Sequence, residues 1–232
     1  MNRNNIFSIL FCITLLLSAC AKQITKGEAF PKMYKEHPLS ILVLPPMNES
    51  TAADAKEYYS TTITEPLSES GYYVLPLEVV SDILKSEGMY DTETLKNIPP
   101  QKFKEYFGAD AVLYISILKW NTKYLVIAAN VTVSVKFLLK STVTGDVIWK
   151  YDGTITVDTS GSDAGAPGLA GLLIKVITTA VKTAVTDYVP LAKRANQITL
   201  ISIPSGKYHP NYDKDRDAKV VIEKKVKKPP KE

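Results

Sequence analysis

Cys20 is the residue of this sequence whose chemistry its neighbours define most closely. It follows Leu-Ser-Ala at residues 17–19, at the end of an apolar run over residues 6–17 that Arg3 precedes. A basic start, an apolar run and small residues before a cleavage point form a secretory signal. With cysteine directly after that point the pattern is a lipobox: cleavage makes the cysteine the new N-terminus, and its thiol takes up lipid. We therefore expect residues 1–19 to be a signal peptide and Cys20 to be the lipid attachment site.

The same segment has two other interpretations, an uncleaved membrane anchor and an ordinary signal peptide with a cysteine nearby by chance. A helix needs about 20 apolar residues to cross a bilayer, whereas this run has twelve and is followed by Lys22 and Lys26. Bacterial lipoproteins carry two or three acyl chains, palmitate among them, and stable attachment takes at least two. Ala21, rather than aspartate, follows the cysteine, as in lipoproteins sent to the outer membrane. We expect the protein to be anchored there, facing the periplasm.

Few residues are available for metal or cofactor chemistry. Cleavage removes Cys12 and lipid occupies Cys20, so no thiol remains for a disulfide, a metal or a nucleophile. The two histidines are His37 and His209, and a zinc site would need both of them, with carboxylates, from the two ends of the mature chain. We predict no metal site and no cofactor.

Three aspartates near the C-terminus have the spacing that opens a calcium loop. Asp213, Asp215 and Asp217 occupy positions one, three and five. The loop also needs glycine at position six and glutamate at position twelve, but Ala218 stands at six and Glu223 falls at eleven. Lysines crowd the same segment, so we do not expect calcium binding.

Positive charge is concentrated at the C-terminal end. The chain has a formal net charge of +4, and from Lys207 onward nine Lys/Arg face five Asp/Glu. Residues 20–206 hold eighteen basic and nineteen acidic side chains. Nucleic-acid binding needs a basic face on the folded domain, so this distribution and the export signal both argue against it. The lysine-rich end is typical of a disordered, solvated terminus, with anionic headgroups or cell-wall polymer as alternative contacts.

One α/β domain over residues 39–206 is expected to position the remaining residues. Residues 20–38 contain a glycine and two prolines without a sustained period, which favours a flexible lipidated tether. Residues 207–232 form the lysine-rich tail, which we expect to be disordered. The mature chain is long enough for a single buried core between these ends.

The first half of the domain alternates strands with helices. The expected strands cover residues 40–44 and 72–75, and the expected helices cover residues 53–70, 77–87 and 99–107. Pro66 should kink the first helix or end it early. Such alternation predicts parallel strands joined by right-handed crossovers.

The second half is rich in β-branched and aromatic residues with turn-sized gaps. Segments 111–120, 125–141 and 146–158 predict an antiparallel meander. Apolar and polar residues alternate over residues 131–137, which predicts that one face of the sheet is exposed to solvent. The glycine-rich stretch 161–171 lacks the lysine and Ser/Thr of a phosphate loop, which favours a connection. A long amphipathic helix over residues 169–189 should follow, packed on the sheet or facing a partner or lipid. The expected fold is therefore α/β with a mixed sheet and this helix.

Four motifs together resemble a known family: ILVLPPMNES, YYSTTITEPLSESGYYVLP, FGADAVLYISILKW and YHPNYDKD. They resemble the outer-membrane lipoproteins first noted among meningococcal surface antigens, a family of unknown function, over essentially the whole mature chain. That family is similar in fold to the N-terminal domain of the TolB translocation protein and more distantly to the curli secretion lipoprotein CsgG. Because its members often occur beside a CsgG-like lipoprotein, the resemblance implies an accessory role in envelope assembly or secretion. The lysine-rich end departs from the family, so the resemblance assigns it no role.

Two classes of function remain. The first is a non-enzymatic lipoprotein that presents its domain to a protein partner, for which the resemblance implies a CsgG-like lipoprotein. Exposed tyrosines and a loop are its candidate contacts, the loop residues being Pro45, Pro46, Asn48 and Ser50. The second is a hydrolase of envelope polymers using paired carboxylates, for which Asp54, Glu57, Asp110 and Asp152 are available without a defining spacing. We favour the first, and two carboxyl groups facing each other in a deep cleft would favour the second.

Overall fold

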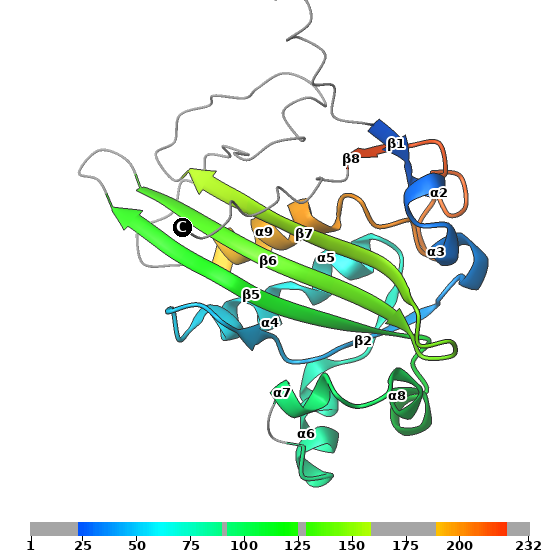
Figure 1. The fold of residues 1–232 in the computed structure, drawn as a ribbon, viewed down its shortest axis with the longest axis horizontal. Helices are drawn as coiled ribbons and strands as arrows, with labels where there is room; N and C mark the ends of the chain where they lie inside the picture. The colour runs from blue at the N-terminus through cyan, green and yellow to red at the C-terminus, as the bar shows by residue number, and fades with distance from the viewer. Residues whose placement is uncertain (1–22, 90–91, 125–128, 159–188, 222–232) are drawn as a thin grey trace, which may run out of the picture.

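A curved mixed β-sheet with helices on both faces forms the centre of the molecule (Figure 1). The computed structural model describes residues 23–89, 92–124, 129–158 and 189–221 of the 232-residue chain. The six-stranded sheet has the order β4-β2-β5-β6-β7, and β3 pairs with β5 beyond the end of β2. A separate two-stranded sheet joins β1 to β8.

The parallel half of the sheet contains β2 (Ser40–Val43), β4 (Tyr73–Val74) and β5 (Ala111–Tyr124). Strand β2 runs parallel to both neighbours, and β3 (Met47–Asn48) continues the parallel pairing along β5. The apolar residues of β2 are buried on both faces of the sheet, as a central parallel strand requires. The prediction of a parallel first half is confirmed.

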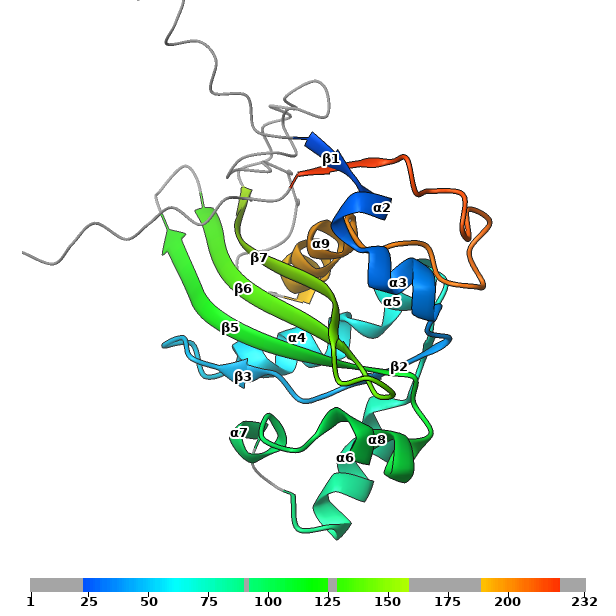
Figure 2. The same cartoon turned by 45° about the vertical axis from the view of Figure 1, so that its right-hand side comes forward.

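The antiparallel half is a meander of β5, β6 (Ala129–Ser141) and β7 (Val147–Asp158). Register shifts in both pairings, one of them between Ile117 and Lys119, mark bulges, which bend strands and increase their twist. The sheet is correspondingly curved (Figure 2). Buried Val133, Val135 and Phe137 alternate with half-buried polar residues, so one face is packed and the other is polar, as predicted.

Helices pack on the two faces of the sheet in separate groups. The first group is α4 (Ala55–Thr62), α5 (Thr64–Glu69) and α9 (Val189–Leu200), which share the larger core cluster with the inner face of β5–β7. The second group is α6 (Leu77–Ser86), α7 (Thr92–Leu95) and α8 (Pro100–Phe107), which surround a smaller cluster. Residues of β2 face the two clusters in alternation, so both groups are fixed to the same strand.

The helix predicted over residues 53–70 is two short helices separated at Ile63. Proline has no N–H to donate to the carbonyl four residues earlier, and α4 ends at Thr62, four residues before Pro66. The early end that Pro66 predicted is therefore present, with the proline inside the first turn of α5.

The N-terminal segment differs from the expected tether. From Gln23 onward it forms β1 (Gln23–Thr25), α2 (Lys26–Ala29) and α3 (Pro31–Glu36). The side chains of Phe30, Met33 and Tyr34 are buried. Pro31 occupies the first position of α3, where its missing N–H costs nothing, so a residue that suggested a coil instead begins a helix.

The C-terminal segment is ordered beyond residue 207, where a disordered tail was expected. Residues 207–218 follow a series of turns, and β8 (Lys219–Val221) pairs with β1. The signal peptide, Cys20, the glycine-rich stretch, nearly all of the predicted helix over residues 169–189, and residues 222–232 lie outside the described residues. Within the described part of the chain, no helix is long and apolar enough to cross a bilayer.

Candidate functional site

Strands β1 and β8 form a ribbon, the terminal ribbon, that joins the two ends of the described chain (Figure 1). Gln23 lies opposite Val221 in antiparallel register. Val220 is buried and Ile24 packs against the larger core cluster, so one side of the ribbon belongs to the core. The segment that leads from Cys20 and the segment that leads to the lysine-rich end therefore meet the ribbon at the same end.

The C-terminal segment completes the N-terminus of α2, which starts directly at the ribbon. Thr25 and Glu28 form a capping box, with the Glu28 N–H donating to the Thr25 hydroxyl at 3.2 Å and the Thr25 N–H donating to the Glu28 carboxylate at 2.8 Å. The N–H of Lys26 donates to the Ala218 carbonyl at 2.8 Å, so a first-turn donor without an intrahelical acceptor is satisfied. The Thr-x-x-Glu spacing is a sequence signal for a helix start that the sequence analysis missed.

Asp215 is the centre of the contacts between the C-terminal segment and the N-terminal helices. Its carboxylate accepts from the Lys26 ammonium at 3.0 Å, the Tyr34 hydroxyl at 2.9 Å and the Ser205 N–H at 2.9 Å. The Lys26 ammonium also donates to the Ile203 carbonyl at 2.7 Å. The side chains of Asp215 and Lys26 are only 10% and 12% exposed. The ion pair is therefore largely buried, and both charges have further hydrogen-bond partners, as stable burial requires.

These contacts shift two pKa values in opposite directions. Burial acts to raise the pKa of Asp215, but hydrogen bonds from Lys26, Tyr34 and the Ser205 N–H outweigh it, so the pKa lies below its ordinary value. Burial and the neighbouring carboxylate raise the pKa of the Tyr34 hydroxyl. At neutral pH the carboxylate is therefore charged and Tyr34 remains a donor to it.

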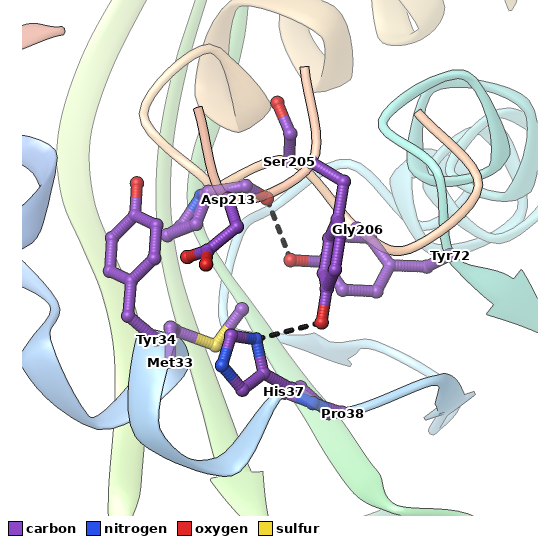
Figure 3. A pocket seen from close by; sticks show the side chains of 10 residues that line it. Met33, Tyr34, His37, Pro38, Tyr72, Ser205, Gly206 and Asp213 are labelled. Atoms are coloured by element: carbon purple, nitrogen blue, oxygen red, sulfur yellow. Dashed lines mark hydrogen bonds between the residues drawn. The ribbon is translucent and has the colours of Figure 1, made fainter. Parts of the chain in front are cut away.

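Two further contacts hold the same segment over α3. The Arg216 guanidinium lies 4.6 Å from the centroid of the Tyr34 ring and pairs with Asp213 at 2.8 Å. The Tyr212 hydroxyl and His37 Nδ1 are joined by a hydrogen bond of 2.9 Å (Figure 3). His37 thus has a structural partner contributed from the far end of the chain.

Glycines at two positions let the C-terminal segment lie directly on the turn before β4. Gly71 has φ +88°, and a Cβ there would clash with the backbone nitrogen of His209. A Cβ on Gly206 would clash with the Gly71 carbonyl oxygen, and the Gly206 N–H donates to the Ser70 carbonyl at 2.8 Å. Because only glycine lacks the Cβ, both positions require it.

A small hollow lies between α3, Tyr72 and the C-terminal segment (Figure 3). On the wall of this hollow, the Tyr72 hydroxyl donates to the Pro204 carbonyl at 2.6 Å. The volume of the hollow is about 10 Å³, which is room for about one water molecule. Pockets for organic ligands are typically about 300–1,000 Å³, so this hollow is too small for a sugar or a peptide.

The predicted contact loop is shaped by its own side chains. Pro46 is buried, whereas Pro45, Asn48 and Ser50 are half-buried. The Asn48 amide donates to the Ala52 carbonyl at 2.7 Å and accepts from the Ser50 hydroxyl at 2.6 Å. Asn48 therefore holds the turn from β3 into α4, and Pro45, Asn48 and Ser50 are the partly accessible residues of the four.

Asp110 has a structural environment rather than that of a general acid. Its carboxylate accepts from the Leu39 and Ser40 N–H groups at 3.1 and 3.2 Å and from the Lys104 ammonium at 2.6 Å. Burial acts to raise its pKa, but these hydrogen bonds outweigh it and lower the pKa. A catalytic acid needs a raised pKa, so Asp110 instead ties the start of β2 to the start of β5.

The other carboxylates proposed for hydrolysis are not brought together with Asp110. Asp152 lies on β7 and pairs with Lys136 of β6, which pairs in turn with Ser116 of β5. Ser116 is six residues, or about 20 Å along the strand, from Asp110. Glycosidase carboxyl groups lie about 5 to 9.5 Å apart. Asp54 and Glu57 are exposed at the start of α4, on the face of the sheet opposite Asp152.

Two of the three aspartates with calcium-loop spacing are paired with basic side chains. Asp213 pairs with Arg216 and Asp215 with Lys26, while Asp217 is exposed. Over the described ranges, no group of three or more His, Cys, Asp or Glu residues is placed to hold a metal ion. Asp213 and Asp215 therefore make contacts within the chain.

Among the side chains that the structure describes, the polar face of the meander carries four lysines that the sequence did not single out, namely Lys119, Lys136, Lys140 and Lys150. Lys119 and Lys150 are exposed and the other two are half-buried. The Lys140 ammonium lies 5.0 Å from the centroid of the Tyr114 ring. We call these four residues the sheet lysines, a basic surface separate from the terminal ribbon.

Most of the chain matches known proteins. Residues 29–207 match the family model described as "Putative lipoprotein GNA1162-like". A relative from Neisseria meningitidis serogroup B, "Putative lipoprotein NMB1124/NMB1162", is 33% identical over 173 residues, 75% of this chain and 79% of the relative. The crystal structure of lipoprotein GNA1162 from Neisseria meningitidis superposes with a TM-score of 0.50 and 35% identity, covering 55% of this chain and 88% of that one. The terminal ribbon lies outside the range matched by the family model.

Proposed function

The chain belongs to the GNA1162-like family of lipoproteins, and we propose that it is a non-enzymatic protein anchored through Cys20 that presents its α/β domain to a protein partner. The observation that carries this proposal is the start of the fold at Gln23, only three residues after Cys20. A chain extends at most about 3.6 Å per residue. An acylated Cys20 would therefore hold the domain within about 11 Å of its attachment point, so that a partner at the same membrane can reach it.

The finer location and partner belong to the same proposal. We place the anchor in the outer membrane, with the domain in the periplasm, because Ala21 rather than aspartate follows Cys20. The partner is an envelope lipoprotein of the CsgG-like class, and it contacts the loop at Pro45, Asn48 and Ser50. These residues are partly accessible, and β3 within this loop lies away from the terminal ribbon (Figure 2), which supports that assignment.

Replacing Cys20 tests the anchor directly. We expect Cys20→Ser to abolish incorporation of labelled palmitate and to leave the protein unprocessed, whereas Cys12→Ser, the matched control within the leader, should be acylated and cleaved like wild type. Membrane fractionation and cross-linking with mass spectrometry in intact cells measure location and partners. Unchanged acylation, outer-membrane location and cross-links in Cys20→Ser would overturn the proposal.

A further inference from the structure

Three of the sheet lysines, Lys119, Lys136 and Lys150, form a slanting line across the meander, which we call the lysine row. Lys119 lies opposite Ser134, so Lys136, two residues further along β6, is its diagonal neighbour. Lys136 lies opposite Asp152, so Lys150, two residues earlier on β7, is in turn its diagonal neighbour. Diagonal neighbours in a sheet are about 7–8 Å apart. The row therefore crosses β5, β6 and β7 in nearly even steps, on the face of the sheet opposite α4, α5 and α9 (Figure 1).

The lysine row carries positive charge that the described part of the chain does not pair. Lys104 and Lys193 each form an ion pair with a carboxylate, whereas no described carboxylate forms one with a member of the row. Two exposed acids lie nearby, Asp152 beside the row and Glu49, whose N–H donates to the Ile117 carbonyl. The four sheet lysines less these two acids leave a local charge of +2. This face of the sheet therefore favours an anionic partner.

The spacing of the lysine row matches that of an extended polypeptide. A strand rises about 3.3–3.4 Å per residue and its side chains alternate between two sides, so every second side chain lies on one side, about 7 Å from the next. Three carboxylates at alternate positions of such a segment would lie opposite the three ammonium groups. Lipid-binding clusters typically hold 4–8 basic residues, more than this row provides. The geometry therefore favours an acidic protein segment over a membrane surface.

We infer that the lysine row binds an extended acidic segment of a protein partner, with Asp or Glu at alternate positions. The row begins beside the proposed contact loop, because Asn48 pairs with Ile117, two residues before Lys119. The inference rests on the proposed function only for the protein that carries the segment. Exposed ion pairs add little affinity singly but favour one partner and one register. The row would thus select and align the partner that the loop contacts.

The test uses the mature chain, residues 20–232, with Cys20→Ser so that no acyl chain contributes. The probes are two fluorescent seven-residue peptides, each of three aspartates and four threonines. One has aspartate at alternate positions, and the other has its three aspartates consecutive in the middle, where at most two can face the sheet. Fluorescence anisotropy at low salt should show the alternating peptide binding about threefold tighter, the difference of one exposed ion pair.

The triple variant K119Q/K136Q/K150Q should bind the alternating peptide about tenfold more weakly, because three exposed ion pairs are lost. The matched control K35Q/K96Q/K207Q removes the same charge at exposed positions elsewhere and should bind within about twofold of the parent. Carbodiimide, which joins a carboxylate to an amine in contact with it, should link the peptide to Lys119, Lys136 and Lys150, as mass spectrometry identifies. Urea denaturation checks that both variants remain folded.

Three results would overturn the inference. These are equal affinity for the two peptides, equal weakening in the two triple variants, and binding to phosphatidylglycerol vesicles that K119Q/K136Q/K150Q abolishes while neither peptide binds. The last result would assign the row to lipid headgroups instead. None of them depends on acylation. Failure of the proposed anchor appears instead as normal palmitate labelling of Cys20→Ser in cells.

Discussion

At the scale of single residues, Asp215 decides how the two ends of the chain are held together. It contacts Lys26 and Tyr34, which precede it by 189 and 181 residues. A largely buried carboxylate with one cationic partner and several further donors is stable only while all of them remain in place. The terminal ribbon and α2 therefore depend on this one charge.

Asp215→Asn should lower the free energy of unfolding by about 2 kcal/mol at pH 7, because the hydrogen bonds to a charged acceptor are weakened and Lys26 loses its counter-charge. Urea denaturation of the mature Cys20→Ser chain measures the change. Asp217→Asn, at an exposed position in the same segment, is the control and should stay within about 0.5 kcal/mol of the parent. Equal effects of the two substitutions would contradict the assigned role.

The effect of Asp215→Asn on the free energy of unfolding depends on pH, because the pKa of Asp215 is lowered in the folded state. The pKa of the unfolded carboxyl is about 3.9, and the pKa of the folded carboxyl lies below it. The stabilisation by Asp215 is therefore fully present above the unfolded pKa and is lost as the pH falls through the folded pKa. The difference in the free energy of unfolding between the parent and Asp215→Asn should be constant near neutral pH and should disappear in acid.

At the scale of elements, local patterns predicted the sheet but not the ribbon that closes it. The apolar run at residues 40–44 and the alternation of apolar and polar residues over residues 131–137 each lie within one continuous segment. Both patterns can therefore be recognised in the sequence. Strands β1 and β8 have three residues each, too few for a period, and they pair across almost the whole chain. Likewise Asp215 was recognised by its spacing to other aspartates, while its partners Lys26 and Tyr34 are distant in sequence.

The pairing of β1 with β8 can be tested by a disulfide between Gln23→Cys and Val221→Cys in the mature Cys20→Ser chain, which has no other thiol. Paired Cα atoms lie within the 4.4–6.8 Å that a disulfide spans. We expect ready oxidation and stabilisation of about 2–4 kcal/mol, detected by resistance to alkylation and by urea denaturation. The pair Gln23→Cys with Lys207→Cys, which does not face across the ribbon, should remain reduced. Equal oxidation of both pairs would refute the register.

At the scale of the whole molecule, the ribbon and α6 lie at opposite ends in both views (Figures 1 and 2). Under the proposed function, a lipid attached three residues before the ribbon would give the domain a near end and a far end. Had residues 20–38 been a flexible tether, the domain could have turned freely above the membrane. If Cys20 is the anchor, as proposed, the folded N-terminal segment would replace that freedom with one preferred orientation.

This orientation predicts a difference between two labelling sites in the acylated protein. A dye on Lys219→Cys, in β8, should transfer energy strongly to an acceptor in the headgroup layer, and a dye on Asp82→Cys, exposed in α6, should transfer weakly. Inserting twenty Gly/Ser residues after Ala21 adds a coil of roughly 25 Å root-mean-square length, which should weaken transfer at Lys219→Cys and reduce the difference between the sites. Equal transfer from both sites without the insertion would show that the ribbon does not face the membrane.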